Sequence, residues 1–159
     1  MQDELLALAA QVGEKLVRNG QMLALAESCT GGWIAQSITA VSGSSRWFDR
    51  GFVTYSNASK QQMLGVGEKT LEAFGAVSAE TAKAMAQGAL LHSNAQIALA
   101  VTGIAGPDGG TEDKPVGLVF LAWQIKGRDC RCIEQHFSGG RHEVRYQTVR
   151  KALRCLLDE

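Results

Sequence analysis

Apolar residues recur at helical spacing near both ends of the chain. Over residues 3–18 they repeat along one face of a helix, and the stretch "RNG" ends the pattern at Gly20. The residues at helical spacing in this first segment are Leu5, Leu6, Leu8, Ala9, Val12 and Leu16. The last segment, 141–159, has its inward positions at Val144, Val149, Leu153 and Leu156. This spacing predicts two amphipathic helices that each bury one face in a core.

Short apolar runs between these helices indicate strands. Residues 95–103, "AQIALAVTG", form a continuous apolar run, which is typical of a strand buried on both faces. The stretch "KGRD" separates two further runs and indicates a hairpin. Strands are therefore predicted at residues 22–26, 47–56, 95–103, 116–125 and 130–138.

Helical segments separate the first three of these strands. One is predicted to open at Thr30, in "TGGWIAQSITAV". A second runs from the N-cap Asn57 to Gly65, and a third covers 78–93 with Ser78 as its N-cap. Strands that alternate with helices and then end in a hairpin and a helix predict an α/β fold. We expect three layers, α/β/α, with a mostly parallel sheet and an antiparallel edge hairpin.

Length and charge narrow the possible classes of protein. The 159 residues contain no internal repeat, low-complexity tract or long linker, so a single domain over residues 1–159 is expected. The formal net charge is zero, whereas a nucleic-acid groove needs a basic face. No apolar run reaches the roughly 20 residues of a membrane span, and the acidic start is unlike a signal peptide. We therefore expect neither nucleic-acid nor membrane partners.

The four cysteines do not form a pattern typical of a metal site. Cys130 and Cys132 are separated by one residue, while zinc ligands usually stand two to four residues apart. Reduced, partly buried thiols are the simpler interpretation. A cytoplasmic location follows as the default expectation, with no metal bound.

Three loops that carry polar residues and glycines each follow a predicted strand. They are "ESCTGG", "TYSNASK" and "TGIAGPDGG". Open α/β sheets bind ligands at the carboxyl ends of their strands. The three loops are therefore expected to converge on one site.

Ser28, in the first loop, has two interpretations. It can be a helix N-cap, because serine is favoured there. It can also be a nucleophile placed before a helix N-terminus, where free N–H groups of Thr30, Gly31 and Gly32 would stabilise an oxyanion. The residues alone leave this choice open.

A serine nucleophile needs a base. None of the three histidines stands in one of these loops, and the G-x-S-x-G of the α/β-hydrolases is absent. Lys60, which follows Tyr55 in "YSNASK", is the remaining candidate, since burial lowers the proton affinity of a lysine. Taken alone, Lys60 is more simply a solvated helix residue.

The loop "TGIAGPDGG" lacks the G-K-[ST] of a phosphate-binding P-loop, and the chain lacks the dinucleotide pattern G-x-G-x-x-G. Its glycines allow the backbone to approach a ligand closely. An ordinary turn-rich loop is the alternative interpretation.

Taken together, four long motifs resemble a known family. They are "AESCTGGW", "GSSRWFDRGFVTYSNASK", "AVTGIAGPDGGTEDKPVGLVF" and "FSGGRHEVR". In order and spacing they are similar to the nicotinamide-nucleotide amidases, the free-standing form of the C-terminal domain of the competence/damage-inducible protein CinA. The resemblance covers nearly the whole chain.

The resemblance implies hydrolysis of the carboxamide of nicotinamide mononucleotide to nicotinic acid mononucleotide and ammonia, without cofactor or metal. It assigns catalysis to Ser28, Lys60 and Tyr55, and it favours Ser28 over the neighbouring thiol of Cys29 as the nucleophile. It places Arg141 at the substrate phosphate. The other residues expected to bind substrate are Thr30, Gly31, Thr102, Gly103, Ile104, Ala105 and Gly106.

One position departs from the family pattern, which commonly has Asp before that arginine, where this chain has Gly140. A homodimer is compatible with the resemblance and rests on nothing else. Two alternatives remain: a catalytically inactive paralogue that binds a pyridine nucleotide, and an amidase for a related amide.

Overall fold

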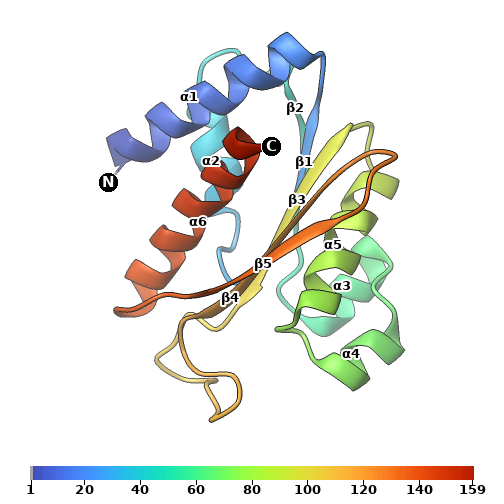
Figure 1. Ribbon diagram of the computed structural model, residues 1–159, viewed down its shortest axis with the longest axis vertical. Coiled ribbons are helices and arrows are strands. Elements are labelled where there is room, and N and C mark those ends of the chain that lie inside the picture. Colours follow the sequence, from blue (N-terminus) through green and yellow to red (C-terminus); the bar gives the residue numbers. More distant parts are fainter. Residues whose placement is uncertain (1) are drawn as a thin grey trace.

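A five-stranded mixed sheet forms the centre of the molecule (Figure 1). The structure is a computed structural model, and it describes residues 2–159. The strands are arranged in the order β2-β1-β3-β4-β5. Their bounds are β1 (Leu23–Glu27), β2 (Phe48–Val53), β3 (Ile97–Gly103), β4 (Leu118–Ile125) and β5 (Arg131–His136).

The sheet has a parallel part and an antiparallel part. Strand β1 pairs in parallel with β2 and with β3. Strand β4 pairs antiparallel with β3, and the β4–β5 hairpin forms the edge. The predicted α/β class with an antiparallel edge hairpin is confirmed. Strand β1 lies between β2 and β3, and all three run in the same direction. Their carboxyl ends therefore meet at one edge of the sheet, where open α/β sheets bind ligands.

Helices cover both faces of the sheet, which confirms the three-layer arrangement (Figure 1). On one face lie α1 (Gln2–Asn19), α2 (Trp33–Thr39) and α6 (Arg141–Asp158). On the other face lie α3 (Asn57–Leu64), α4 (Glu68–Phe74) and α5 (Ala79–Leu91). A single turn of 3-10 helix, η1 (Ser44–Arg46), precedes β2.

The two faces of β1 differ in the size of their side chains. Its alternating sequence LALAE places Leu23 and Leu25 in the core shared with α1 and α6, and Ala24 and Ala26 in the core shared with α5. The small residues let α5 pack closely. A Cβ at Gly88 of α5 would overlap the carbonyl oxygen of Leu64, so this contact requires glycine.

Helix α2 begins later than predicted. The expected start at Thr30 is wrong, since the helix begins at Trp33. Gly31 and Gly32 have φ angles of 57° and 101°, a left-handed conformation that cannot continue into a right-handed helix. The polypeptide between β1 and α2 is therefore a tight turn over residues 28–32. We call it the nucleophile turn, after the role that the resemblance implies for Ser28.

On the other face of the sheet, the start of α3 differs from the prediction by one residue and the start of α5 agrees with it. The N-cap of α3 is Ser56 and not Asn57, because Ser56 and Ser59 form a reciprocal capping box. Ser78 caps α5 as predicted, and its Oγ accepts from the N–H of Thr81 at 3.1 Å. Helix α4 was not predicted, because its seven residues bury only Leu71 and show no clear period.

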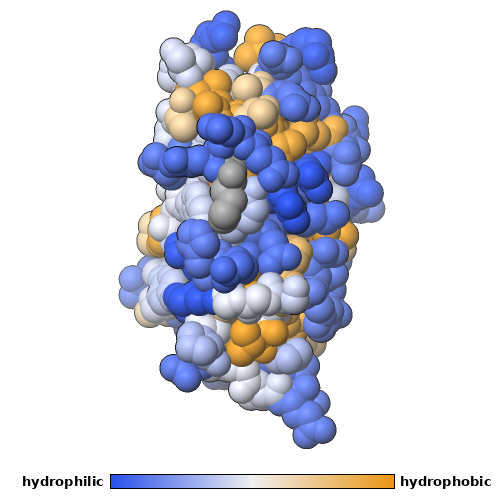
Figure 2. Space-filling model, turned by 90° about the vertical axis from the view of Figure 1, so that its left-hand side faces the viewer, coloured by the Kyte–Doolittle hydropathy of each residue, from blue (hydrophilic) through white to orange (hydrophobic). Residues whose placement is uncertain are grey.

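Figure 2 shows the side of the molecule that carries α1, α2 and α6. This face is largely hydrophilic, and its hydrophobic residues form separate patches. Within residues 2–159, every helix is too short or too polar to cross a bilayer. The fold thus leaves the carboxyl edge of β1, β2 and β3 as the place where the polar loops gather.

Candidate active site

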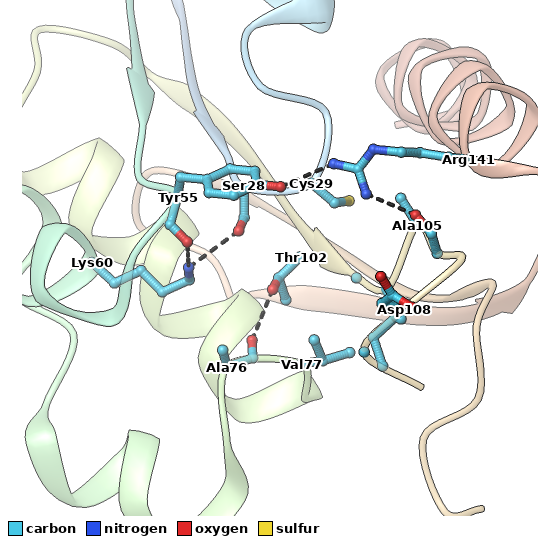
Figure 3. Close-up of a pocket in the computed structure, with 14 residues that line it drawn as sticks. Ser28, Cys29, Tyr55, Lys60, Ala76, Val77, Thr102, Ala105, Asp108 and Arg141 are labelled. Atoms are coloured by element: carbon cyan, nitrogen blue, oxygen red, sulfur yellow. Dashed lines mark hydrogen bonds between the residues drawn. The ribbon is translucent and has the colours of Figure 1, made fainter. Parts of the chain in front are cut away.

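The three loops identified in the sequence converge on one pocket of about 250 Å³ at the carboxyl edge of the parallel strands (Figure 3). They are joined there by the segment before α5 and by the start of α6. The lining residues are Ser28, Cys29, Tyr55, Lys60, Ala76, Val77, Thr102, Gly103, Ile104, Ala105, Gly106, Asp108, Gly109 and Arg141.

Ser28 is the first residue after β1 and is nearly buried, with 8% of its surface exposed. Its N–H donates to the carbonyl oxygen of Val101 at 3.1 Å, which ties it to β3. Its Oγ lies 3.1 Å from Nζ of Lys60. Ser28 is therefore not the N-cap of α2, which is Gly32, and its hydroxyl faces the pocket.

Lys60 reaches the pocket from α3 and has only 1% of its surface exposed. Besides Ser28, its Nζ contacts the carbonyl oxygens of Thr54 at 2.9 Å and Tyr55 at 3.4 Å. No carboxylate within residues 2–159 forms a salt bridge with it. Burial lowers the pKa of Lys60, because the charged form loses solvation without gaining a counter-ion. The interpretation of Lys60 as a solvated helix residue is therefore wrong.

The three oxygen contacts of Nζ fit both protonation forms of the amine. In the charged form, Nζ donates to Ser28 Oγ and to the carbonyl oxygens of Thr54 and Tyr55. In the neutral form, which burial favours, the two carbonyls can only accept and take the two hydrogens, so the remaining lone pair can accept from the Ser28 hydroxyl. A serine held in this way against an amine base can be deprotonated as it adds to an acyl carbon.

Cys29 lines the same pocket, and burial shifts the pKa of its thiol upward, whereas it shifts the pKa of Lys60 downward. Only 5% of its surface is exposed, and burial raises the pKa of its thiol to about 12. The thiolate is the reactive form of a cysteine. At neutral pH Cys29 is therefore an unreactive thiol.

Arg141 and Tyr55 meet at the mouth of the pocket (Figure 3). Nη2 of Arg141 donates to the phenol oxygen of Tyr55 at 3.0 Å, and Nη1 donates to the carbonyl oxygen of Gly106 at 2.8 Å. The phenol of Tyr55 thus contacts Arg141, while its backbone carbonyl contacts Lys60. Within residues 2–159, the hydrogen bond between Tyr55 and Lys60 is made by the backbone carbonyl of Tyr55 and not by its phenol.

Arg141 is the first residue of α6, and Gly140 is the N-cap. Gly140 has no side chain to accept from the first N–H groups of the helix, and no side-chain cap replaces it. The N-terminus of α6 therefore has no side-chain cap at Gly140, and its first turn also carries the acidic Glu143. The carboxylate of Glu143 offsets the positive end of the helix, so the guanidinium of Arg141 is the group here that attracts an anion.

The segment from Thr102 to Gly106 lines the pocket, as expected of substrate-binding residues. The hydroxyl of Thr102 is buried and donates to the carbonyl oxygen of Ala76 at 2.8 Å. Thr30 and Gly31 are not brought into the lining. Thr30 is buried with its hydroxyl on Glu27, and the N–H of Gly31 donates to the carbonyl oxygen of Ser28. The expectation that this N–H is free is therefore wrong.

Sequence reasoning missed two acidic residues, one that lines the pocket and one that lies directly before Ser28 in the chain. Asp108 is the one acidic residue among the residues that line the pocket within the described chain. Glu27 is buried, with 1% of its surface exposed, directly before Ser28. The signal for Glu27 was available, because a charged residue that ends an otherwise apolar strand needs partners inside the fold.

The described part of the chain, residues 2–159, contains no cluster of three or more histidine, cysteine or acidic side chains arranged to hold a metal ion. The polar side chains that line the pocket carry two aliphatic hydroxyls, a thiol, a phenol, an amine, a guanidinium and a carboxylate.

Comparison with known proteins finds relatives of similar length and longer relatives that match over only part of their length. It is 50% identical over 153 residues to the nicotinamide-nucleotide amidohydrolase PncC of Escherichia coli (strain K12), covering 96% of this chain and 93% of the relative. It is also 50% identical over 157 residues to the protein of the same name from Pseudomonas putida, covering 98% and 96%. A CinA-like protein of Syntrophotalea carbinolica is 51% identical over 149 residues, which are 94% of this chain and 36% of the longer relative.

Solved structures agree with the fold. The crystal structure of the competence/damage inducible protein CihA from Agrobacterium tumefaciens matches with a TM-score of 0.95 and 49% identity, covering 98% of this chain and 94% of that one. The competence damage-inducible protein A from Klebsiella pneumoniae matches with a TM-score of 0.94 and 36% identity, covering 98% and 96%. The sequence profile described as the CinA C-terminal domain matches residues 5–159. The chain therefore belongs to the CinA C-terminal domain family.

Proposed function

We propose that this protein hydrolyses the carboxamide of nicotinamide mononucleotide to nicotinic acid mononucleotide and ammonia. The relatives that carry the name nicotinamide-nucleotide amidohydrolase are 50% identical over nearly the full chain. The observation that carries the proposal is the distance of 3.1 Å between Ser28 Oγ and Lys60 Nζ, in a pocket that also presents Arg141.

The proposed reaction has two stages. Neutral Lys60 takes the hydroxyl proton as Ser28 Oγ attacks the carboxamide carbon, which gives a tetrahedral intermediate. The Lys60 ammonium then protonates the departing nitrogen, ammonia leaves, and an ester to Ser28 remains. Water attacks this ester with Lys60 again as base, which releases the carboxylic acid and restores the serine.

Arg141 is proposed to read the phosphate. Its guanidinium is held by Tyr55 and Gly106 at the mouth of the pocket and keeps further N–H groups for a ligand. Since the formal net charge of the chain is zero, selection for a charged substrate must come from such local groups.

Replacing Arg141 with alanine is expected to lower kcat/KM for nicotinamide mononucleotide by roughly 10- to 150-fold, the worth of one or two charge-assisted contacts. The riboside lacks the phosphate, so its hydrolysis should change little. The test is to measure steady-state kinetics of the unmodified protein and of Arg141→Ala with the mononucleotide and with the riboside. An equal loss on the two substrates would show that Arg141 supports the structure and does not read the phosphate.

The direct test of the function is ammonia release by the purified protein. We expect release from nicotinamide mononucleotide, less from the riboside, and least from free nicotinamide, which lacks both ribose and phosphate. Binding of the mononucleotide without ammonia release would instead identify an inactive pyridine-nucleotide-binding paralogue. Faster release from another amide would identify an amidase of different specificity.

A further inference from the structure

The carboxylate of Glu27 is buried, and both of its oxygens accept hydrogen bonds from other groups of the protein. Its Oε1 accepts from the hydroxyl of Thr30 at 2.6 Å and from the N–H of Ile34 at 2.9 Å. Its Oε2 accepts from the N–H of Ala35 at 3.0 Å. Glu27 therefore joins the end of β1 to the first turn of α2 and spans the nucleophile turn between them.

A helix start does not by itself require this arrangement. Serine, threonine, aspartate or asparagine at the N-cap would satisfy the same donors from a single position. Here the N-cap is Gly32, which has no side chain, and the acceptor is a buried carboxylate five residues earlier. Burying a carboxylate is costly unless it is well bonded. Its place directly before Ser28 suggests a role in the nucleophile turn as well as in the helix.

The nucleophile turn needs support from outside. Gly31 and Gly32 are both left-handed and contribute no side chains to hold it. Besides Glu27, Arg145 contacts the turn and donates to the carbonyl oxygens of Cys29 at 3.1 Å and Thr30 at 3.0 Å. The turn is thus held by the carboxylate of Glu27, which accepts hydrogen bonds, and by the guanidinium of Arg145, which donates them.

Glu27 also connects the two proposed catalytic partners through its backbone. Its carbonyl oxygen accepts from the N–H of Thr54 at 2.9 Å. The carbonyl oxygen of Thr54 in turn accepts from Nζ of Lys60 at 2.9 Å. A shift of Glu27 would therefore move Ser28 and the anchor of Lys60 relative to each other.

We propose that Glu27 is a positioning residue, whose carboxylate holds the nucleophile turn so that Ser28 Oγ stays in hydrogen-bond contact with Lys60 Nζ. The proposal rests on the proposed function, in which Ser28 is the nucleophile. It also means that the N–H groups of Ile34 and Ala35 are occupied, so the N-terminus of α2 is closed to an oxyanion.

The test is Glu27→Gln, which keeps the shape but replaces one acceptor oxygen with a donor. One of the three donors then faces an N–H₂ group, and the turn must shift. We expect kcat for nicotinamide mononucleotide to fall by about 10- to 100-fold per folded molecule, as for a displaced reacting group, with KM changed less than about twofold. Circular dichroism and thermal melts give the folded fraction.

Asp49→Asn is the matched control. Asp49 is also a strand carboxylate that accepts a backbone N–H, from Asn94 at 3.0 Å, but it lies outside the pocket lining. Its replacement is expected to lower the melting temperature and leave kcat unchanged. If Glu27→Gln loses activity only in proportion to its folded fraction, as a purely structural residue would, the proposal is overturned.

Two further measurements keep the outcome decisive. If Glu27→Gln does not fold, Thr30→Val is the alternative variant, because it removes only one donor to the carboxylate. We then expect kcat to fall by about tenfold with KM retained. An unchanged kcat in Thr30→Val would overturn the proposal.

Ser28→Ala separates this inference from the proposed function. A fully active Ser28→Ala protein would remove both, whereas an inactive Ser28→Ala beside a fully active, folded Glu27→Gln would remove only the role of Glu27.

Discussion

Ser28→Ala is expected to lower kcat for nicotinamide mononucleotide by at least about 10³-fold while the protein stays folded, because the attacking oxygen is lost. Residual turnover would reflect substrate binding and electrostatic stabilisation alone. Ammonia release under saturating substrate measures the effect, and a thermal melt confirms the fold. The methyl group of alanine is smaller than the side chain it replaces, and the one side-chain hydrogen bond of Ser28 within residues 2–159 is the one with Lys60.

Cys29→Ala is the control for this experiment. It removes the neighbouring nucleophilic atom and should retain most of the activity, because burial raises the pKa of the Cys29 thiol to about 12 and leaves it protonated at neutral pH. Full activity in a folded Ser28→Ala protein, together with inactive Cys29→Ala, would transfer the proposed role from the hydroxyl to the thiol.

Lys60→Arg is expected to be almost inactive, with a loss in kcat again of about 10³-fold or more. Arginine keeps the positive charge but cannot deprotonate at working pH, so it cannot accept the proton of Ser28. Its planar fork also differs from an amine that contacts three oxygens at one nitrogen. Lys69→Arg, on the exposed surface of α4, is the matched control and should be fully active. Rates like those of the unmodified protein in Lys60→Arg would refute the base assignment.

The pH profile provides an independent check on Lys60. Burial lowers its pKa, and only the neutral amine can act as base, so kcat/KM should rise with pH through the lowered pKa and then level off. This rise should be centred below the roughly 10.4 of an ordinary lysine. In the same pH window the unfolded chain binds the proton that the folded chain has released, so the free energy of unfolding also rises with pH. A profile without this rise would contradict the assignment.

The order of elements could be predicted from local sequence because it depends on local rules. Alternation in LALAE and the continuous run through β3 identify strands and their buried faces. Ser78 was recognisable as a cap because it bonds only three residues ahead. Helix α2 was misplaced because two left-handed glycines delay its start, and glycine type alone does not reveal the sign of φ.

The sequence by itself determined the fold class, the convergence of three loops on one site, and the candidates Ser28, Lys60 and Arg141. The rule that open α/β sheets bind ligands at the carboxyl ends of their strands was enough to predict that those loops come together. Motifs that extend along most of the chain were enough to indicate the family, which the comparisons then confirmed.

Only the tertiary structure decided the state of the individual groups. That Lys60 is buried and loses proton affinity depends on packing against segments 32 residues away, around Ser28. The phenol of Tyr55 meets Arg141 across 86 residues, and Arg145 reaches the nucleophile turn from 116 residues away. Burial and hydrogen bonding between distant segments set the pKa and orientation of a side chain, and local sequence does not carry either.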